Sequence, residues 1–437
     1  MSGFGSFDTA LLGLTAQTIA IGHISDNVAN AGTNGYKQVD TAFSDLVFTK
    51  LQGAGGNSDA TRNMGVSAIP DFANRRQGTI IHDDSLTSIA VNGAGFIPVA
   101  KPTGFNAADG TPSGFEDTTY YTRLGDFRLD NSNRLVNSAG YYLQAAAVNG
   151  TTPGDFVIDD SDIAAVPTST ISYKINLPAS ANTGTTVANG IGLIDANSVQ
   201  QDFGVTWTKT AADTWDLTIN TAGGTPSSFG PVTVTFANGV LASMTTADPN
   251  LTVSGAGAAT IGFSPDFGAG AQAITLDLGT YGSVFSTDST SGLTQYASQT
   301  SAATNFDISQ NGLLSGQFTN VSFDEDGQII YNYTNARSQV GGQILLANFP
   351  EPDRLDRVDG TAYRGTTVAG DVVYGIPGDP TGTTGLGHIV ASSLEQSNVD
   401  VAEQMTRLIV AQQAYGMNSQ VIKASDDMLS RAIDMKR

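Results

Sequence analysis

The side chains that most often perform acid–base catalysis are scarce in this sequence. Its three histidines, His23, His82 and His388, lie in different segments, with no hydroxyl or carboxylate partner at a recognisable motif spacing. A histidine without such partners is more often structural or solvent-facing than catalytic. We therefore expect no catalytic residues and classify the chain as a non-enzyme.

Clustered acidic residues are the next candidate chemistry, because carboxylates bind metal ions. Asp324, Glu325 and Asp326 precede Gly327, but a calcium-binding loop needs ligands at several further positions, ending in a distant glutamate. An Asp-Gly pair between strand-like segments is typical of a tight hairpin turn. The chain also has no cysteine, which excludes disulfides and thiolate metal sites. We predict a turn at this position, and no metal or other cofactor.

Paired tyrosines suggest an alternative, the stacking of aromatic rings on sugars. In Tyr120-Tyr121 and Tyr141-Tyr142, neighbouring side chains of a strand should point to opposite faces, which places one ring in the core and one at the surface. A glycosidase would also need two suitably placed carboxylates, and the sequence nominates no such pair. A secreted β-rich carbohydrate-binding or hydrolytic protein is the alternative from a different functional class.

Composition narrows the range of partners. Among 437 residues, 41 are acidic and 20 are basic, which gives a formal net charge of −21. Nucleic acids and anionic membranes bind clustered Lys and Arg, so we expect neither as a partner. No segment approaches the ~18 consecutive apolar residues of a membrane helix. The first basic residue is Lys37, too late for the basic start of a secretory signal. We expect a protein that is cytoplasmic or is exported without a cleaved signal.

Both chain ends are predicted to be long helices, because apolar residues recur there at spacings of three and four. The seam residues are Leu11, Leu14, Ile21, Ile24 and Val28 near the N-terminus, and Val401, Met405, Leu408, Tyr415, Ile422, Leu429 and Ile433 near the C-terminus. Asp400 is placed to cap the second helix, with Glu403 reaching back to complete a capping box. A helix of roughly 50 Å needs a partner along its length. The two helices could each pack on a sheet, but their terminal positions favour pairing with each other.

Between the helices, short β-rich runs alternate with Gly, Asn and Asp turns. Runs such as ISYKINL, FGVTWTK and TWDLTIN predict a small sandwich or barrel within a nested chain. The predicted fold is mainly β with terminal α-helices: two antiparallel β domains and a helical coiled-coil domain. The predicted ranges are 1–35 and 392–437 for the helical coiled coil, 36–77 and 350–391 for extended connectors, 78–145 and 300–349 for an inner β domain, and 146–299 for an inserted outer β domain.

The two ends also carry motifs of a known family. Residues 24–37, ISDNVANAGTNGYK, resemble the N-terminal signature of bacterial flagellar rod, hook and hook-associated proteins. Residues 397–429 resemble that family's C-terminal pattern. The signature positions that we single out are Asn27, Asn30, Gly35, Tyr36, Lys37, Asn398 and Asp400. The sequence departs from the pattern at Gln413, where an arginine is frequent, and at Gly416, where glycine costs a helix about 1 kcal/mol relative to alanine.

The resemblance implies a self-assembling structural protein. Within the family, the insertion at 146–299 favours a subunit of the curved, hollow hook, the universal joint that transmits torque from rod to filament. A distal rod or hook–filament junction protein is the alternative. The seam residues would then form the assembly interface, and the glycine-rich segments 53–65 and 360–387 would supply compliance.

The resemblance also implies partners and a location. The implied partners are further copies of the chain in a helical homopolymer, the hook cap, rod and hook–filament junction proteins, and the flagellar type III export apparatus. The implied location is extracellular, in the hook of the basal body, reached without a cleaved signal peptide.

Overall fold

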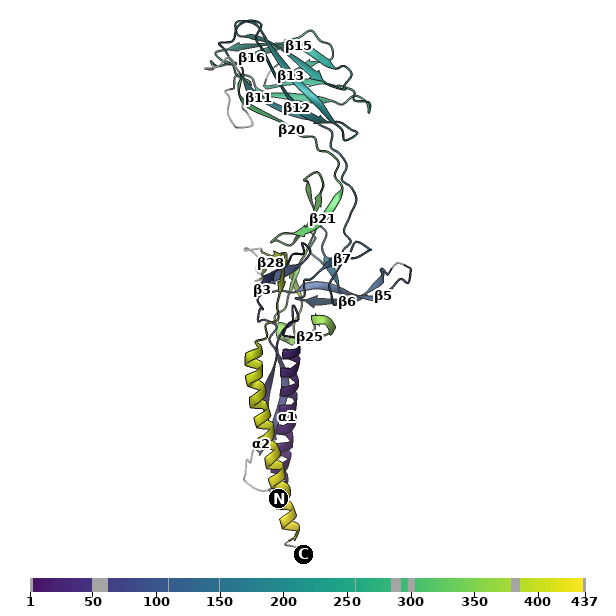
Figure 1. The fold of residues 1–437 in the computed structure, drawn as a ribbon, viewed down its shortest axis with the longest axis vertical. Coiled ribbons are helices and arrows are strands. Elements are labelled where there is room, and N and C mark those ends of the chain that lie inside the picture. Colours follow the sequence, from purple (N-terminus) through teal and green to yellow (C-terminus); the bar gives the residue numbers. More distant parts are fainter. Residues whose placement is uncertain are drawn as a thin grey trace, which may run out of the picture. The chain divides into compact units, whose positions relative to one another are not determined.

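The computed structural model describes residues 3–48, 62–108, 110–148, 150–255, 257–283, 292–297, 303–378 and 386–434. One helix lies at each end of this part of the chain, α1 (Gly3–Ala29) and α2 (Val401–Asp434), and β-strands fill the sequence between them (Figure 1). The predicted fold class, mainly β with terminal α-helices, is confirmed. Neither helix is long and apolar enough to cross a membrane.

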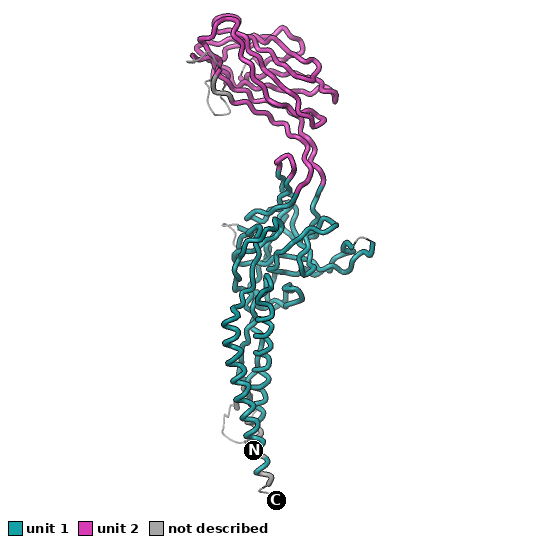
Figure 2. The backbone as a smooth tube through the Cα atoms, viewed as in Figure 1, with its two compact units in different colours: residues 1–160, 320–332, 338–437 teal, residues 161–319, 333–337 magenta. Residues whose placement is uncertain are grey.

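The chain divides into two compact units (Figure 2). Unit 1 contains Met1–Asp160, Asn320–Asn332 and Ser338–Arg437, and unit 2 contains Ser161–Thr319 and Tyr333–Arg337. Unit 2 is thus inserted into unit 1, and it lies further along the chain than the range 146–299 predicted for the insert.

Unit 2 is built from two five-stranded sheets that share one core. The first sheet has the order β17 (Thr252–Val253), β18 (Ala258–Phe263), β19 (Ile274–Thr280), β11 (Thr170–Asn176), β20 (Thr304–Gln310). The second has the order β12 (Thr186–Ile194), β13 (Gln200–Ala211), β14 (Thr214–Thr221), β15 (Ser228–Ala237), β16 (Val240–Thr246). Alternate residues point inward, so Trp207 of β13 and Trp215 of β14 are fully buried. The three strand-like runs named above are strands, and one neighbouring pair, β11 and β19, is parallel.

Unit 1 contains the two helices and several antiparallel sheets. Its main sheet has the order β25 (Asp356–Arg357), β26 (Ala362–Arg364), β6 (Pro112–Thr122), β5 (Ile97–Phe105), β9 (Tyr142–Ala145), β8 (Leu135–Val136), β7 (Arg128–Leu129), with β10 (Gly154–Asp155) on β9. A three-stranded sheet has the order β21 (Phe318–Phe323), β22 (Gln328–Tyr333), β23 (Ser338–Gln343). The predicted hairpin turn at 324–327 joins β21 to β22, with Gly327 at a φ of 80°.

Two strand pairs join the two distant halves of unit 1: β28 (His388–Ala391) with β4 (Ile89–Asn92), and β29 (Ser393–Glu395) with β3 (Ile80–His82). A further pair, β24 (Leu346–Asn348) with β27 (Val373–Gly375), lies within the second half, as do two short 3-10 helices, η1 (Pro352–Arg354) and η2 (Asp359–Thr361). The predicted connector 350–391 therefore contributes strands to the β region. We refer to the strands of unit 1 from β3 onward as the first β region.

A hairpin replaces the irregular connector expected at 36–77. Strands β1 (Val39–Phe48) and β2 (Arg62–Phe72) are antiparallel, with Val39 opposite Phe72, and both pack on α1. Residues 53–61 and 379–385 of the two segments expected to supply compliance lie outside the described residues.

Both tyrosine pairs lie in the core of unit 1, which corrects the expected division into one core and one surface ring. Tyr120, Tyr121, Tyr141 and Tyr142 are all buried. The rings of Tyr120 and Tyr141 meet edge to face at 5.6 Å, and the hydroxyl of Tyr121 lies 3.0 Å from that of Tyr374. Strand alternation assigns a surface ring only where one face of a sheet is open, and here both faces are covered.

Candidate assembly interface

The helix pair is the element that the sequence pattern predicted to carry function. In Figure 1, α1 and α2 lie side by side and run in opposite directions, with both chain ends at the same end of the pair. The amide of Asn27 reaches Gln404 Oε1 at 3.2 Å, and Gly13 lies so close to Asn418 that a Cβ would come within 2.8 Å of its amide. The predicted pairing of the two helices is confirmed.

Small and polar residues make up most of the buried stripes of these helices. The stripe on α1 consists of Ala10, Gly13, Ala16, Ala20, Ile24 and Asn27; that on α2 consists of Gln404, Leu408, Ala411, Asn418, Ile422 and Ser425, several of them only half-buried. Glycine and alanine allow two helices to approach closely, because little side chain separates the backbones.

The predicted seam residues only partly coincide with these stripes. Ile24 is buried, and Leu14, Ile21, Val28, Leu408 and Ile422 are half-buried. Leu11, Val401, Met405 and Tyr415 are exposed, which corrects the expectation that the large apolar residues face the partner helix within one chain. The side chains of Leu429 and Ile433 lie outside the described part of the structure. The role of the seam residues in assembly stays a prediction.

A second heptad-like repeat runs along the outer side of α2. Its members, spaced four and three apart, are Val410, Ala414, Met417, Val421, Ala424 and Met428. The side chains of Val410 and Met417 are 60% and 61% exposed. Residues at this spacing share one side of a helix. We call these six residues the outer stripe. Within the described chain its four larger apolar side chains are exposed to solvent: Val410, Met417, Val421 and Met428.

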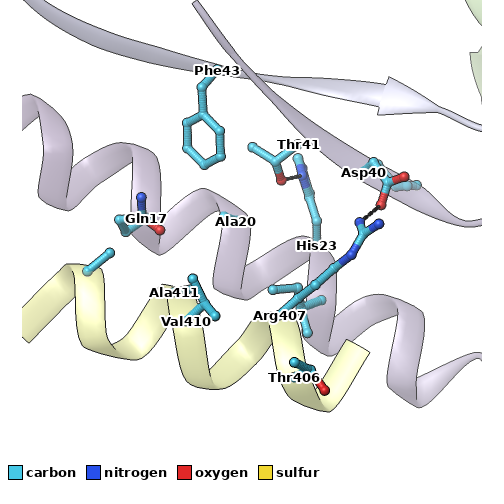
Figure 3. A pocket seen from close by; sticks show the side chains of 13 residues that line it. Gln17, Ala20, His23, Asp40, Thr41, Phe43, Thr406, Arg407, Val410 and Ala411 are labelled. Atoms are coloured by element: carbon cyan, nitrogen blue, oxygen red, sulfur yellow. Dashed lines mark hydrogen bonds and ion pairs between the residues drawn. The ribbon is translucent and has the colours of Figure 1, made fainter. Parts of the chain in front are cut away.

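A groove adjoins this stripe between α1, α2 and β1. It has a volume of about 310 Å³, and its lining includes Ala20, Ile24, Val39, Val410 and Ala411 (Figure 3). Arg407 of α2 forms an ion pair with Asp40 of β1 at the groove, and His23 Nδ1 lies 2.8 Å from Thr41 Oγ1. The alanines leave room for apolar side chains of another helix.

No metal site is present in the described part of the chain, where no three His, Asp or Glu side chains gather closely enough to hold an ion. His388 lies 3.2 Å from Asn92 Nδ2, and His23 contacts Thr41. Each of these two contacts holds a histidine ring in place.

The family-signature residues gather where the helices meet the first β region. Asn27 is fully buried: its amide donates to Val39 O at 2.8 Å, and its side-chain oxygen accepts from Val39 N at 2.9 Å and from the Tyr36 hydroxyl at 3.2 Å. The Arg357 guanidinium lies 4.2 Å from the centre of the Tyr36 ring. Asn27 thus ties α1 to the start of the hairpin and, through Gln404, to α2.

The other signature positions shape the two chain turns beside this network. Gly35 has a φ of 70°, and a Cβ there would lie 2.8 Å from Leu124 N, so only glycine fits. Asn30 caps the turn after α1 by donating to Asp26 O at 2.9 Å. Asn398 accepts from Gln38 N at 2.7 Å and donates to Arg76 O at 2.9 Å.

The predicted cap of α2 is present, but the reciprocal half of the capping box is not. Asp400 Oδ1 accepts from Ala402 N at 2.9 Å and from Glu403 N at 3.1 Å. Glu403 instead pairs with Arg407 at 2.6 Å, one helical turn later. A glutamate four residues before an arginine gains this contact on the same helix face.

Lys37 belongs to a buried charge cluster that no sequence pattern revealed. Its ammonium lies 2.6 Å from Glu395 Oε1, and Arg123 Nη1 lies 3.1 Å from Glu395 Oε2. All three side chains are buried. The partners are far apart in the sequence, and short motifs describe only neighbouring positions.

The charge of Lys37 makes folding dependent on pH. Burial lowers the pKa of Lys37 to about 8 from its usual 10.5, against the attraction of Glu395. Between these values the unfolded chain binds the proton more tightly, so the free energy of unfolding should rise with pH. Above pH ~10 the trend reverses, because burial raises the pKa of Tyr363 to about 12 and the folded chain then retains its proton. We expect a rise on the order of 2 kcal/mol between pH ~8 and ~10.

Urea unfolding followed by the circular dichroism of the helices measures this effect, because both α1 and α2 belong to unit 1. The variant Lys37→Met should lose the rise. Fluorescence of the two tryptophans, both in unit 2, should show no such trend. An equal rise in wild type and variant would contradict the assignment to Lys37.

The sequence of this chain is similar to those of known flagellar hook and rod proteins. Residues 90–191 match the family model described as the flagellar hook protein FlgE/F/G D1 domain, and residues 390–435 match that of the flagellar basal body rod FlgEFG protein C-terminal region. The flagellar hook protein FlgE of Brucella melitensis is 30% identical over 451 residues, covering 100% of both chains. That of Salmonella typhimurium is 26% identical over 457 residues, covering 99% of this chain and 100% of the relative. A solved structure of FlgE2, a hook protein of Helicobacter pylori, has 11% identity and a TM-score of 0.49, covering 72% of this chain and 100% of that chain.

Proposed function

Since this chain belongs to the flagellar hook protein FlgE family and is a hook subunit, we propose that copies of it join through the outer stripe of α2 and the adjoining groove. In this arrangement the stripe of one copy packs against the helices of the next. The polymer is the curved, hollow hook, which transmits torque from the rod to the filament.

The exposure of the outer stripe carries this proposal. A heptad-like repeat normally marks a helix that packs against another helix, and α2 has two such repeats. The buried stripe of α2 faces α1. The outer stripe is exposed to solvent, and its Val410 and Met417 are each more than half exposed. Further exposed apolar side chains lie on the neighbouring elements, including Leu11 on α1 and Phe43 on β1. Burial of such side chains contributes about 1.5–3 kcal/mol each, enough for a few of them to support association.

The groove extends the same surface and suits the same occupant. Val410 belongs to both the outer stripe and the groove, so a helix that covers the stripe also reaches the alanines of α1 and α2 that line the groove. The predicted seam residues Leu11, Val401, Met405 and Tyr415 add exposed apolar area on the helix pair. We include them in the assembly surface.

The remaining roles follow from membership of a structural family. The chain acts without catalysis or cofactor, and its partners are further copies of itself, the hook cap, the rod and the hook–filament junction proteins. It leaves the cell through the flagellar type III export apparatus without a cleaved signal peptide. Unit 2 serves as the outer domain, and compliant segments between rigid domains permit bending.

Localisation and assembly together test the proposal. Antibodies against unit 2 should label isolated flagella in the segment between rod and filament, and the purified full-length chain should form curved tubes visible by electron microscopy. Labelling confined to the rod or to the hook–filament junction would contradict the hook assignment. If the purified chain stays monomeric in every buffer tested, the proposed role of the assembly surface is contradicted.

A further inference from the structure

Three segments meet where the helix pair and its hairpin join the first β region, and Glu395 links them together. The segments are residues 35–38 after α1, residues 73–79 after β2, and residues 395–400 before α2. Glu395 lies in the third. Its carbonyl oxygen accepts from Gly35 N at 2.7 Å in the first, and its Oε1 accepts from Gly78 N at 2.8 Å in the second.

Lys37 strengthens the same crossing point. Its ammonium donates to Glu395 Oε1 at 2.6 Å and to Arg76 O at 2.8 Å, so one side chain from the first segment reaches both of the others. Gln396 N also donates to Thr79 O at 2.9 Å. These bonds therefore fix the positions of the three segments relative to one another.

Arg123 anchors this crossing point to the sheets. Besides its ion pair with Glu395, its guanidinium donates to Val91 O at 3.1 Å and to Gly93 O at 2.7 Å. It also lies 5.3 Å from the centre of the Phe96 ring. Glu395 thus connects the three segments to β4 and to the start of β5.

The charges in this cluster are unusual because two cations share one carboxylate in a buried site. Glu395 is 1% exposed, and it is the acidic residue that pairs with both Lys37 and Arg123. A buried charge is costly unless it is paired, and the removal of one partner leaves the others uncompensated. Apolar side chains could fill the same space, but they could not accept a hydrogen bond from a particular backbone amide, as Glu395 does from Gly78.

We propose that Glu395 is a positioning residue for assembly, whose carboxylate fixes the helix pair and its hairpin to the first β region. This inference rests on the proposed function in one respect: the fixed orientation is what allows neighbouring copies to meet along the outer stripe. Within one chain, the role is independent of polymerisation.

Three variants separate the charge from the shape of this side chain. Glu395→Gln keeps the shape and leaves two buried cations without a counter-charge. Lys37→Met removes one cation and leaves a one-to-one pair of Glu395 with Arg123. The double variant restores the net charge of the wild-type cluster. Glu351→Gln, in an exposed ion pair with Arg75, is the matched control.

The critical concentration for polymerisation is the first readout. Glu395→Gln should raise it by about 100-fold or abolish polymer, since breaking a buried pair is strongly destabilising. Lys37→Met should stay within about threefold of the wild type, because it leaves Glu395 paired one to one with Arg123. The control should also stay within about threefold, because exposed pairs contribute little. The double variant should recover at least about tenfold relative to Glu395→Gln, which only a charge-specific role predicts.

Amide hydrogen exchange of the soluble chain is the second readout. The amides of Gly35 and Gly78 should exchange at least about tenfold faster in Glu395→Gln than in the control, while tryptophan fluorescence shows that unit 2 remains folded. If Glu395→Gln polymerises at the wild-type concentration into tubes of the same shape, the positioning role is overturned and the proposed function stands. Simple addition of the two single effects in the double variant also overturns it, since packing alone would then suffice.

The two hypotheses fail in different ways. A wild-type chain that forms no polymer removes the proposed function. The exchange measurement then decides the inference alone, and unchanged exchange of Gly35 and Gly78 in Glu395→Gln overturns it as well.

Discussion

Deletion of residues 400–437 should abolish polymerisation and leave a folded, soluble β-rich chain. The deletion removes all of α2, including the outer stripe, the partner of α1 and the Arg407 side of the groove. It leaves Glu395 and Asn398 in place. Sedimentation and electron microscopy should show no polymer, even at about 100 times the concentration at which the wild type assembles, because several apolar contacts of ~1.5–3 kcal/mol each are lost.

The fold of the truncated chain can be followed separately. Trp207 and Trp215 lie in the core of unit 2, so the urea midpoint of their fluorescence should match that of the full chain. A shifted midpoint would mean that the deletion damages more than the interface. Polymer formation by the truncated chain would refute the role of α2.

A pair of charges on the outer stripe should have nearly the same effect without removing any structure. Val410→Glu combined with Met417→Glu places two carboxylates seven residues apart on the same side of α2, at positions that are exposed in the free subunit. The subunit should fold normally, because these side chains contact water. Association would bury the carboxylates without partners, so we expect the critical concentration to rise at least about 100-fold.

The control is Gln413→Glu combined with Gln420→Glu. These positions are also exposed, on the same helix and seven residues apart, and the change in net charge is closely matched. The control should assemble within about threefold of the wild-type concentration. Equal loss in both double variants would assign the effect to net charge and exclude a specific role of the outer stripe.

Local patterns in the sequence predicted much of this fold. The cap at Asp400 depends on residues within one helical turn, and the turn at Gly327 depends on a short Asp-Gly pattern between strands. The strands of unit 2 alternate regularly, as β14 does around Trp215, so their positions could be inferred without knowing their partners. Sheet order and the parallel pairing of β11 with β19 could not, because they depend on contacts between distant segments.

The seam of α2 shows why a correct periodicity can match a helix contact only in part. Large apolar side chains dominate the sequence pattern, whereas the contact with α1 uses alanine, glycine and amides such as Gln404 and Asn418. Small residues stabilise a pair by permitting close approach, and they leave little trace in a hydrophobic pattern. The apolar side chains of Val410 and Met417 are exposed and lie outside this contact.

The pairing within the charge cluster had no sequence signal. Lys37 and Glu395 are separated by 358 positions, and neither is unusual in its local segment. Lys37 belongs to the family motif, but no pattern in the sequence indicates its partner. Buried ion pairs of this kind depend on the completed fold, because only the fold removes both groups from water.

The point at which the chain enters and leaves unit 2 has a consequence for evolution. Strands β11 and β20 are antiparallel neighbours, with Tyr173 opposite Ile308, and the segments outside them are bridged at Val166–Leu313 and Ile163–Gly316. Because the chain returns to the place it left, an insertion of almost any size can occupy this point without changing the path of the remainder. This domain can therefore be exchanged or enlarged while the path of the rest of the chain is kept. The same point is where a foreign domain could be grafted onto the subunit.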